Sequence, residues 1–368
     1  MEPVPFLEEI VRCYSPSREE GGVAMRAVEA MQSLGFRKAY VDAAGNAIGV
    51  VGNPAGRTVM LIGHIDTVPG EIPVRREVVQ GDEKLFGRGS VDAKGSFATF
   101  VQAASRLPVD APVQFIVVGA VEEEVRSSKG ARHLLQSFPE PEFVIIGEPS
   151  GGNGITLGYK GRLLQEVHIT REMAHSASQF LSVGDYLSLW SAHVHSRVAE
   201  KNAGRQPGFR TLDVTVQKLS VSNDGFKEVG ELELGFRLGP EFDPHELDTE
   251  LTATFAEWIA SLPNDPTCQV RMECCQHEVP AEYSKKSDLA GAFRKAMRAV
   301  GVEPRHVVKT GTSDMNVLAR GWGCAMVAYG PGDSALDHTP HEHISLAEYL
   351  KSIDILEQVL LSLNEKLA

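Results

Sequence analysis

Residues 115–124 read FIVVGAVEEE, and this stretch decides the fold. Its first six residues form a continuous apolar run, which is typical of a strand buried on both faces of a largely parallel sheet. Three glutamates follow at once. Open α/β sheets bind their ligands at the carboxyl ends of such strands. We therefore expect an α/β domain with a polar site where this strand ends.

The segments around this strand alternate between strand and helix patterns, which favours an α/β domain with a mixed central sheet. The spacing of apolar residues predicts strands at 39–41, 47–51, 59–62, 143–146 and 325–329. It predicts helices at 5–13, 19–34, 97–107, 129–137, 288–299, 313–319 and 346–363.

The pattern changes between residues 161 and 276. Alternating strands are expected at 163–169, 211–219, 231–236 and 269–274, and helices at 180–198 and 244–261. This β-α-β-β-α-β order is typical of an antiparallel, ferredoxin-like α+β domain. A chain of 368 residues also exceeds one ordinary core. We expect a catalytic domain of residues 1–160 and 277–368, interrupted by an inserted domain of residues 161–276.

Composition excludes several classes of protein. Apolar residues make up 42% and the apolar runs fall well short of the roughly 20 residues of a membrane span. The N-terminal MEPVPFLEEIVRC lacks a signal-peptide layout, so we expect a cytoplasmic protein. A net charge of −13 argues against nucleic-acid binding. Five cysteines without a CxxC pair argue against a disulfide framework or a thiolate zinc site.

Metal-binding residue types recur where predicted strands end. They are His64 and Asp66 in VMLIGHID, Asp92 in GRGSVDAKG, Glu122 to Glu124, Glu148 in GEPS, and His338 in GPGDSALDHTPHE. Each alone has an ordinary explanation as a loop residue, a helix cap or a solvated face. Together, two histidines and several carboxylates are the ligand mix of zinc, for which cobalt or manganese can substitute. A dinucleotide fingerprint is disfavoured, because Asp92 stands where its last glycine should be.

Seven segments between positions 63 and 342 together resemble the M20 family of co-catalytic metallopeptidases, which are amidohydrolases with two zinc ions. The segments are GHIDTVPG, LFGRGSVDAKG, AVEEE, IIGEPS, AHSA, GTSDMN and GPGDSALDHTPHE. Residue by residue, the resemblance implies this ligand set: Asp92 bridging both metals, His64 and Glu148 completing one site, and Glu123 and His338 completing the other.

The resemblance also implies roles around the metals. Asp66 would orient His64, and Glu122 would be the general base that takes a proton from water and delivers it to the departing amine. The family usually shows Asp before the two glutamates, whereas this chain has Val121. Matching the strand FIVVGA favours Glu122 as base and Glu123 as ligand. A shift by one residue would make Glu123 the base and Glu124 the ligand.

Further family features fall on the inserted domain and beside it. The resemblance implies a homodimer formed through this domain, with His175 donating to the oxyanion from the partner subunit. Lys160 and Arg162 in GYKGR are candidates for holding a substrate carboxylate, although both can also be solvated strand residues. Thr312 and Ser313 in GTSD are expected to face the substrate, and the peptide bond after Asp92 is expected to be cis.

Within the family, further segments resemble the hydrolases that release lysine, and in some members ornithine, from the amino-group carrier protein LysW in lysine synthesis through α-aminoadipate. These are YSPS, GHIDTVPGEIPVR, VGAVEEE, SSKGARHL, IGEPSG and GITLGYKGRLL. An alternative is a deacylase or dipeptidase for free substrates such as N-acetyl-lysine, N-acetylornithine or N-succinyl-diaminopimelate. A third hypothesis, a non-catalytic zinc-binding protein that dimerises, is disfavoured by the complete ligand set plus Glu122.

Overall fold

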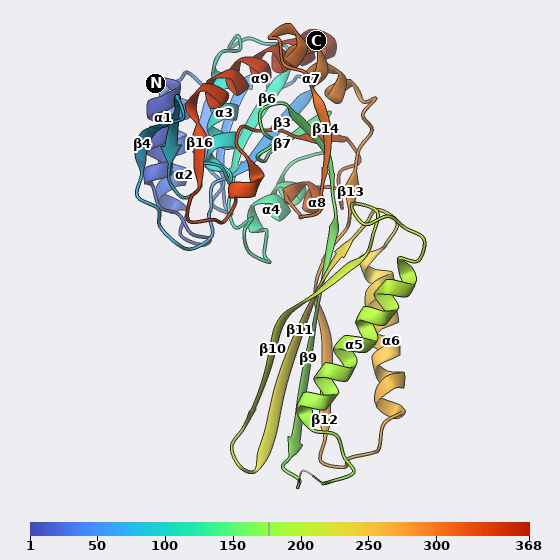
Figure 1. Cartoon of the computed structure of the whole chain (residues 1–368). Coiled ribbons are helices and arrows are strands. Elements are labelled where there is room, and N and C mark those ends of the chain that lie inside the picture. The colour runs from blue at the N-terminus through green and yellow to red at the C-terminus, as the bar shows by residue number, and fades with distance from the viewer. Residues whose placement is uncertain (176) are drawn as a thin grey trace. The chain divides into compact units, whose positions relative to one another are not determined.

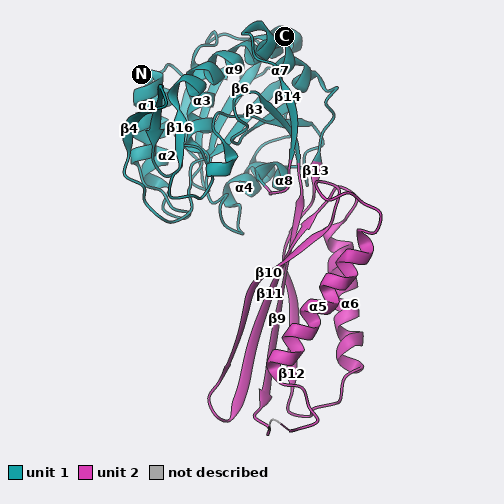
Figure 2. Ribbon diagram, in the orientation of Figure 1, with its two compact units in different colours: residues 1–158, 282–308, 313–368 teal, residues 159–281, 309–312 magenta. Residues whose placement is uncertain are grey.

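The computed structural model describes residues 1–175 and 177–368, which form two compact units (Figure 2). Unit 1 comprises Met1–Gly158, Glu282–Val308 and Ser313–Ala368. Unit 2 comprises Tyr159–Ala281 and the short return Lys309–Thr312. The return belongs to unit 2 in part because the carbonyl of Lys309 accepts a hydrogen bond of 3.1 Å from the Lys160 N–H. Sequence periodicity did not predict this segment, since it is too short to carry a pattern.

Unit 1 is built on a mixed sheet whose strand order is β1-β2-β6-β3-β7-β15-β8-β13, with β14 beside β8. Strands β6, β3, β7 and β15 run parallel, and β1, β2 and β8 pair antiparallel. The strands are β1 (Lys38–Val41), β2 (Ala47–Gly52), β3 (Thr58–His64), β6 (Gln114–Ala120), β7 (Phe143–Gly147), β8 (Gly154–Tyr159), β13 (Ala281–Glu282), β14 (Arg305–Lys309) and β15 (Ala325–Ala328).

The three central strands are apolar and almost completely buried, as expected of parallel strands covered on both faces. Helix α3 packs on β3 and β6 and is buried nearly all round. The helices of unit 1 are α1 (Pro3–Arg12), α2 (Gly21–Ser33), α3 (Lys94–Ser105), α4 (Lys129–Ser137), α7 (Asp288–Ala299), α8 (Asp314–Leu318) and α9 (Leu346–Leu367), with a 3₁₀ turn at Ser334–Leu336 (Figure 1). Of the helices that the structure describes, none is long and apolar enough to cross a bilayer.

Strand register brings the expected ligands to one edge of the sheet. Residue His64 of β3 pairs with Ala120 of β6, and Gly63 pairs with Gly147 of β7. Because these strands are parallel, the chain leaves β6 and β7 beside His64.

A second sheet was not expected from the sequence. It joins β4 (Arg75–Val79), β5 (Asp82–Phe86) and β16 (His343–Ser345). Strand β4 is mostly exposed, so it shows no apolar pattern. The pairing of Phe86 with His343 matters for the site, because it brings the segment before Asp92 next to the segment after His338.

Unit 2 is an antiparallel sheet in the order β10-β11-β9-β12, with two helices over one face (Figure 1). This is the β-α-β-β-α-β arrangement that the sequence predicted. Its elements are β9 (Gly161–Glu172), α5 (Val183–Lys201), β10 (Asp213–Asn223), β11 (Lys227–Leu238), α6 (Pro244–Ala260) and β12 (Gln269–Glu278).

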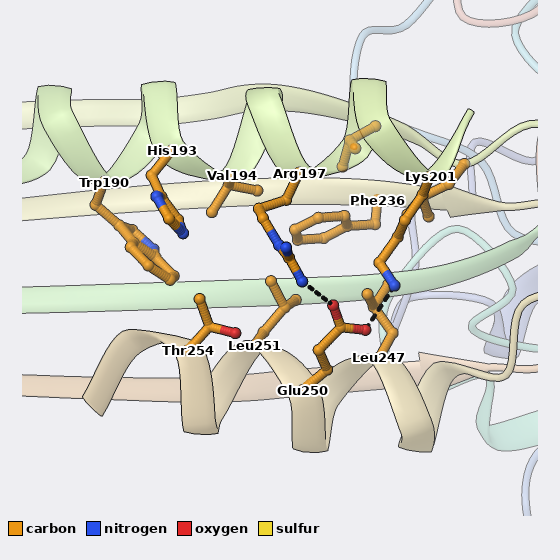
Figure 3. A pocket seen from close by; sticks show the side chains of 12 residues that line it. Trp190, His193, Val194, Arg197, Lys201, Phe236, Leu247, Glu250, Leu251 and Thr254 are labelled. Atoms are coloured by element: carbon orange, nitrogen blue, oxygen red, sulfur yellow. Dashed lines mark hydrogen bonds and ion pairs between the residues drawn. The ribbon is translucent and has the colours of Figure 1, made fainter. Parts of the chain in front are cut away.

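An ion-pair cluster connects the two helices of unit 2. Glu250 of α6 accepts a hydrogen bond of 3.1 Å from Arg197 and one of 2.6 Å from Lys201, both on α5 (Figure 3). The three side chains border a narrow apolar pocket over Leu251 and Trp190. The charged groups therefore lie beside the apolar side chains that α5 and α6 bring together.

Candidate metal centre

The carboxylate of Asp92 lies between two imidazoles. His64 Nε2 is 3.1 Å from Asp92 Oδ1, and His338 Nε2 is 3.0 Å from Asp92 Oδ2. Burial raises the pKa of Asp92, but the hydrogen bonds from His338 and His64 lower it by more than burial raises it. The resulting pKa lies far below the usual range of an aspartate. Each carboxylate oxygen thus faces a different histidine, which is the geometry that a bridging carboxylate requires.

Glu124 is the glutamate that joins this pair. Its Oε1 lies 3.0 Å from His338 Nε2. Donor atoms of His64, Asp92 and Glu124 all lie within 4.8 Å of one another. The residues that sequence patterns singled out at positions 64, 92 and 338 therefore converge, and Glu124 completes the group.

Glu123 lies among charged groups at the end of the sheet that carries His64. Burial raises the pKa of Glu123 well above its usual value, His64 opposes that shift, and Glu148 and Asp314 add to it. Glu148 is itself 8% exposed and follows β7 directly. Glu123 is thus a half-buried carboxyl whose pKa responds to the charges of His64 and Glu148.

Glu122 turns away from this group. Its backbone has a left-handed φ of 59°, and its Oε2 accepts a hydrogen bond of 2.5 Å from Ser127. Lys129 Nζ is 3.8 Å from its Oε1. The sequence favoured Glu122 as base and Glu123 as ligand, but these contacts fit the register displaced by one residue. The physical reason is the left-handed turn at Glu122, which sequence periodicity does not reveal.

Asp66 is completely buried and contacts both His64 and the backbone of the glutamate loop. The carbonyl oxygen of Asp66 is 3.0 Å from His64 Nδ1, and its Oδ1 is 3.5 Å from the same nitrogen. The carboxylate also accepts the N–H groups of Glu123 and Glu124, both at 3.1 Å, and the Ser17 hydroxyl at 2.7 Å. It therefore directs His64 Nε2 toward Asp92 and anchors the glutamate loop, as an orienting partner should.

Two residues that sequence analysis did not single out support Asp92. Glu342 accepts hydrogen bonds from the backbone N–H groups of Val91 and Asp92, at 2.9 and 3.2 Å, and pairs with Arg88 at 2.8 Å. Both lie inside the quoted GRGSVDAKG and HTPHE segments, and their position there was the available signal. The peptide bond between Asp92 and Ala93 is cis, as the resemblance implied.

Three of the four candidate substrate contacts, Lys160, Thr312 and Ser313, have side-chain partners within their own units. Lys160 is fully buried and its Nζ donates to Asp213 at 2.5 Å and to the carbonyl of Thr211 at 2.9 Å. These contacts are those of an ion pair within unit 2. Thr312 accepts a hydrogen bond of 3.1 Å from Arg237, and Ser313 caps α8.

The remaining expectations concern β9 and the segment after it. Arg162 sits on β9 between Arg237 and Glu278 in register. His175 is exposed, and its Nδ1 accepts the N–H of Ala177 at 3.1 Å. Ser176 of the AHSA segment lies outside the described residues.

The donor set fits a divalent metal ion. Several carboxylates meet here, and the compensating positive charge comes from the imidazoles. Hydrogen bonds to Asp92 and Glu124 raise the pKa of His338 to about 10. Burial lowers the pKa of His64, but hydrogen bonds to Asp66 and Asp92 raise it well above its usual value. A bound divalent cation would take the place of these protons, because neutral imidazole and carboxylate are its ligands.

Comparison with known proteins gives one family. The description "Peptidase family M20/M25/M40" matches residues 60–362. The LysW-lysine hydrolase of Deinococcus radiodurans is 42% identical over 96% of this chain and 95% of its own length. A Pyrococcus furiosus protein with the provisional name LysW-lysine/LysW-ornithine hydrolase is 37% identical over 99% and 98%. The crystal structure of a Staphylococcus aureus tripeptidase has a TM-score of 0.78 at 16% identity, covering 99% of this chain and 98% of that one, and so shares the fold. The chain therefore belongs to peptidase family M20/M25/M40 and is a hydrolase of amide bonds.

Proposed function

We propose that this enzyme releases lysine, with ornithine as a second candidate, from the carrier protein LysW by hydrolysing the amide that joins them. The observation that carries this substrate assignment is the 42% identity along nearly the full length of a LysW-lysine hydrolase. The match covers both the inserted unit and the catalytic unit, so the similarity extends beyond the residues of the metal centre.

The metal in the proposal is a pair of zinc ions, which cobalt or manganese can replace. Asp92 would bridge them, His64 and Glu148 would complete one site, and Glu124 and His338 the other. Support comes from the two imidazoles on opposite oxygens of Asp92, at 3.1 and 3.0 Å. Two histidines with carboxylates are a zinc-type donor set. When bound, the ions supply Lewis acidity toward the amide carbonyl.

Glu123 is the general base of the proposal. It would take a proton from the attacking water and deliver it to the amine nitrogen as the amide breaks. Its raised pKa, caused first by burial, supports this role, because a base must be able to hold the proton between the two transfers. Asp66 keeps the Nδ1 of His64 occupied, so that its Nε2 remains directed at Asp92.

The inserted unit would serve as lid and dimerisation domain. Its strand β10 pairs with β11 alone among the described strands and exposes Val216, Leu219 and Val221 by 45–48%. An edge strand with exposed apolar side chains favours pairing with a second copy of the chain. His175, which is exposed, would then donate to the oxyanion in the partner. A Leu219→Lys, Val221→Lys variant should be monomeric by light scattering, and an unchanged dimer contradicts this interface.

The proposal places the reaction in the cytoplasm. All five cysteines are free thiols, which agrees with a reducing compartment.

The decisive experiment compares kcat/KM for LysW-linked lysine, LysW-linked ornithine and free N-acetyl-lysine. We expect the carrier-linked lysine to be favoured over the free substrate by roughly 100-fold or more, because a protein substrate adds contacts that the free amide lacks. Glu123→Gln serves as the inactive control. Equal or better turnover of N-acetyl-lysine would instead assign a deacylase for free N-acyl amino acids.

A further inference from the structure

We infer that Arg88 and Glu342 are positioning residues that set the metal affinity of the centre by holding the two ligand segments of Asp92 and His338 together. The inference rests on the metal centre of the proposed function. Neither side chain is a ligand in that proposal, and each acts through the backbone that carries a ligand.

Glu342 fixes the peptide that leads into Asp92. Its Oε1 accepts two consecutive N–H groups, that of Val91 at 2.9 Å and that of Asp92 at 3.2 Å. Two bonds from adjacent amides to one oxygen determine the orientation of the backbone next to the Asp92 side chain. Glu342 is completely buried, so water does not replace these bonds.

Arg88 joins this segment to the one that carries His338. One nitrogen, Nη1, donates to Glu342 Oε2 at 2.8 Å and to the carbonyl of Thr339 at 3.2 Å, directly after His338. Its Nε donates to the carbonyl of Gly70 at 3.0 Å. The guanidinium therefore connects both ligand segments, and this contact set exceeds what a lone surface ion pair provides.

The charge of this pair is part of the argument. A carboxylate next to Asp92 is repelled by it, and burial increases that cost unless a cation is paired with it. Arg88, which is 8% exposed, is the paired cation. A carboxylate is also the group that presents acceptors on both oxygens, toward the amides on one side and Arg88 on the other, whereas an amide side chain has one acceptor oxygen.

A purely structural role is the competing explanation, and unit 2 offers a matched control. Arg171 Nε lies 3.1 Å from Asp265 Oδ2, and the two side chains are 4% and 2% exposed. This pair is buried to the same degree, and no proposed metal ligand belongs to unit 2. Its loss should lower stability without changing metal affinity.

The experiment measures zinc affinity by competition with a chromophoric chelator, and urea unfolding in EDTA, for wild type, Glu342→Gln and Asp265→Asn. We expect Glu342→Gln to raise the zinc dissociation constant by about 10–100-fold, as loss of an orienting partner typically does. Asp265→Asn should leave that constant unchanged although both variants unfold at lower urea. An unchanged dissociation constant in folded Glu342→Gln overturns the inference.

A second variant covers the case in which Glu342→Gln does not fold. Arg88→Lys keeps the positive charge but loses the fork that reaches two segments at once, so its zinc dissociation constant should also rise. If that constant equals the wild-type value, the inference fails. A wild-type protein that binds no zinc, cobalt or manganese rejects the proposed metal centre instead, which separates the two failures.

Discussion

Replacing Glu122, Glu123 and Glu124 by glutamine, one at a time, should give three different results. The side chains are consecutive in sequence but have different surroundings. Glu124 lies 3.0 Å from His338, and Glu122 accepts a hydrogen bond from Ser127. Glu123 is half-buried, and the charges of His64 and Glu148 act on its carboxyl group. The substitution keeps size nearly constant, so differences in outcome report the role of each charge.

Each substitution has an expected magnitude that follows from the role proposed for the side chain. Glu123→Gln removes the proposed general base, and a general base typically supplies 10²–10⁴-fold in rate, or about 3–5 kcal/mol of barrier. Glu124→Gln removes a proposed ligand, so metal content should fall together with activity. Glu122→Gln keeps an acceptor for Ser127 and should cost less than about 1 kcal/mol of stability, with activity close to wild type.

The assay combines kcat on carrier-linked lysine, metal content by mass spectrometry, and urea unfolding. Glu123→Gln should retain full metal content with very low kcat. The reasoning is refuted if Glu122→Gln shows that behaviour while Glu123→Gln loses metal, because the register that the sequence favoured would then be correct.

Three further outcomes follow from the contacts. Removing the metal with a chelator should lower stability, and restoring zinc to 100 times its dissociation constant should return about 2.7 kcal/mol, measured as a shift in the urea midpoint. Burial raises the pKa of Glu250, but hydrogen bonds from Lys201 and Arg197 lower it to below the usual 4.5. The stabilisation by this pair, about 0.5 kcal/mol, should therefore be present above pH 4.5 and be lost as pH falls through the lowered value. Glu250→Gln should consequently match wild type in urea melts at pH 3 but be less stable at pH 7. Gly147→Ala should cost about 1–3 kcal/mol and reduce zinc occupancy, since an added Cβ would lie 2.8 Å from the Cα of Gly63 and would force β3 and β7 apart where each leads to a ligand.

Much of the fold could be predicted because its elements carry local signals. The helix Asp288–Ala299 has the bounds that apolar spacing predicted, and Ser287 caps it by accepting the Ala290 N–H. The α/β character and the inserted β-α-β-β-α-β order followed from a change in periodicity near residue 161. The sheet of β4, β5 and β16 was missed, because its strands are short and partly exposed, and because β16 pairs with β5 across more than 250 residues.

The candidate site likewise contains residues that local sequence patterns indicated and contacts that they did not. Its strand-end residues His64 and Glu148 were accessible from sequence, since an apolar run followed by a metal-binding residue type is a local pattern. The ion pair of Lys160 was not accessible, because its partner Asp213 is 53 positions away.

The sequence by itself determined which residue types follow which strands, because backbone geometry gives strands and helices periods that are visible over a few residues. Only the tertiary structure decided which glutamate meets His338. That choice depends on the left-handed turn at Glu122 and on Asp66, which binds the next two backbone amides from 57 and 58 residues away. Side-chain direction in a loop depends on contacts of this kind, between segments distant in sequence, and therefore appears only in the folded chain.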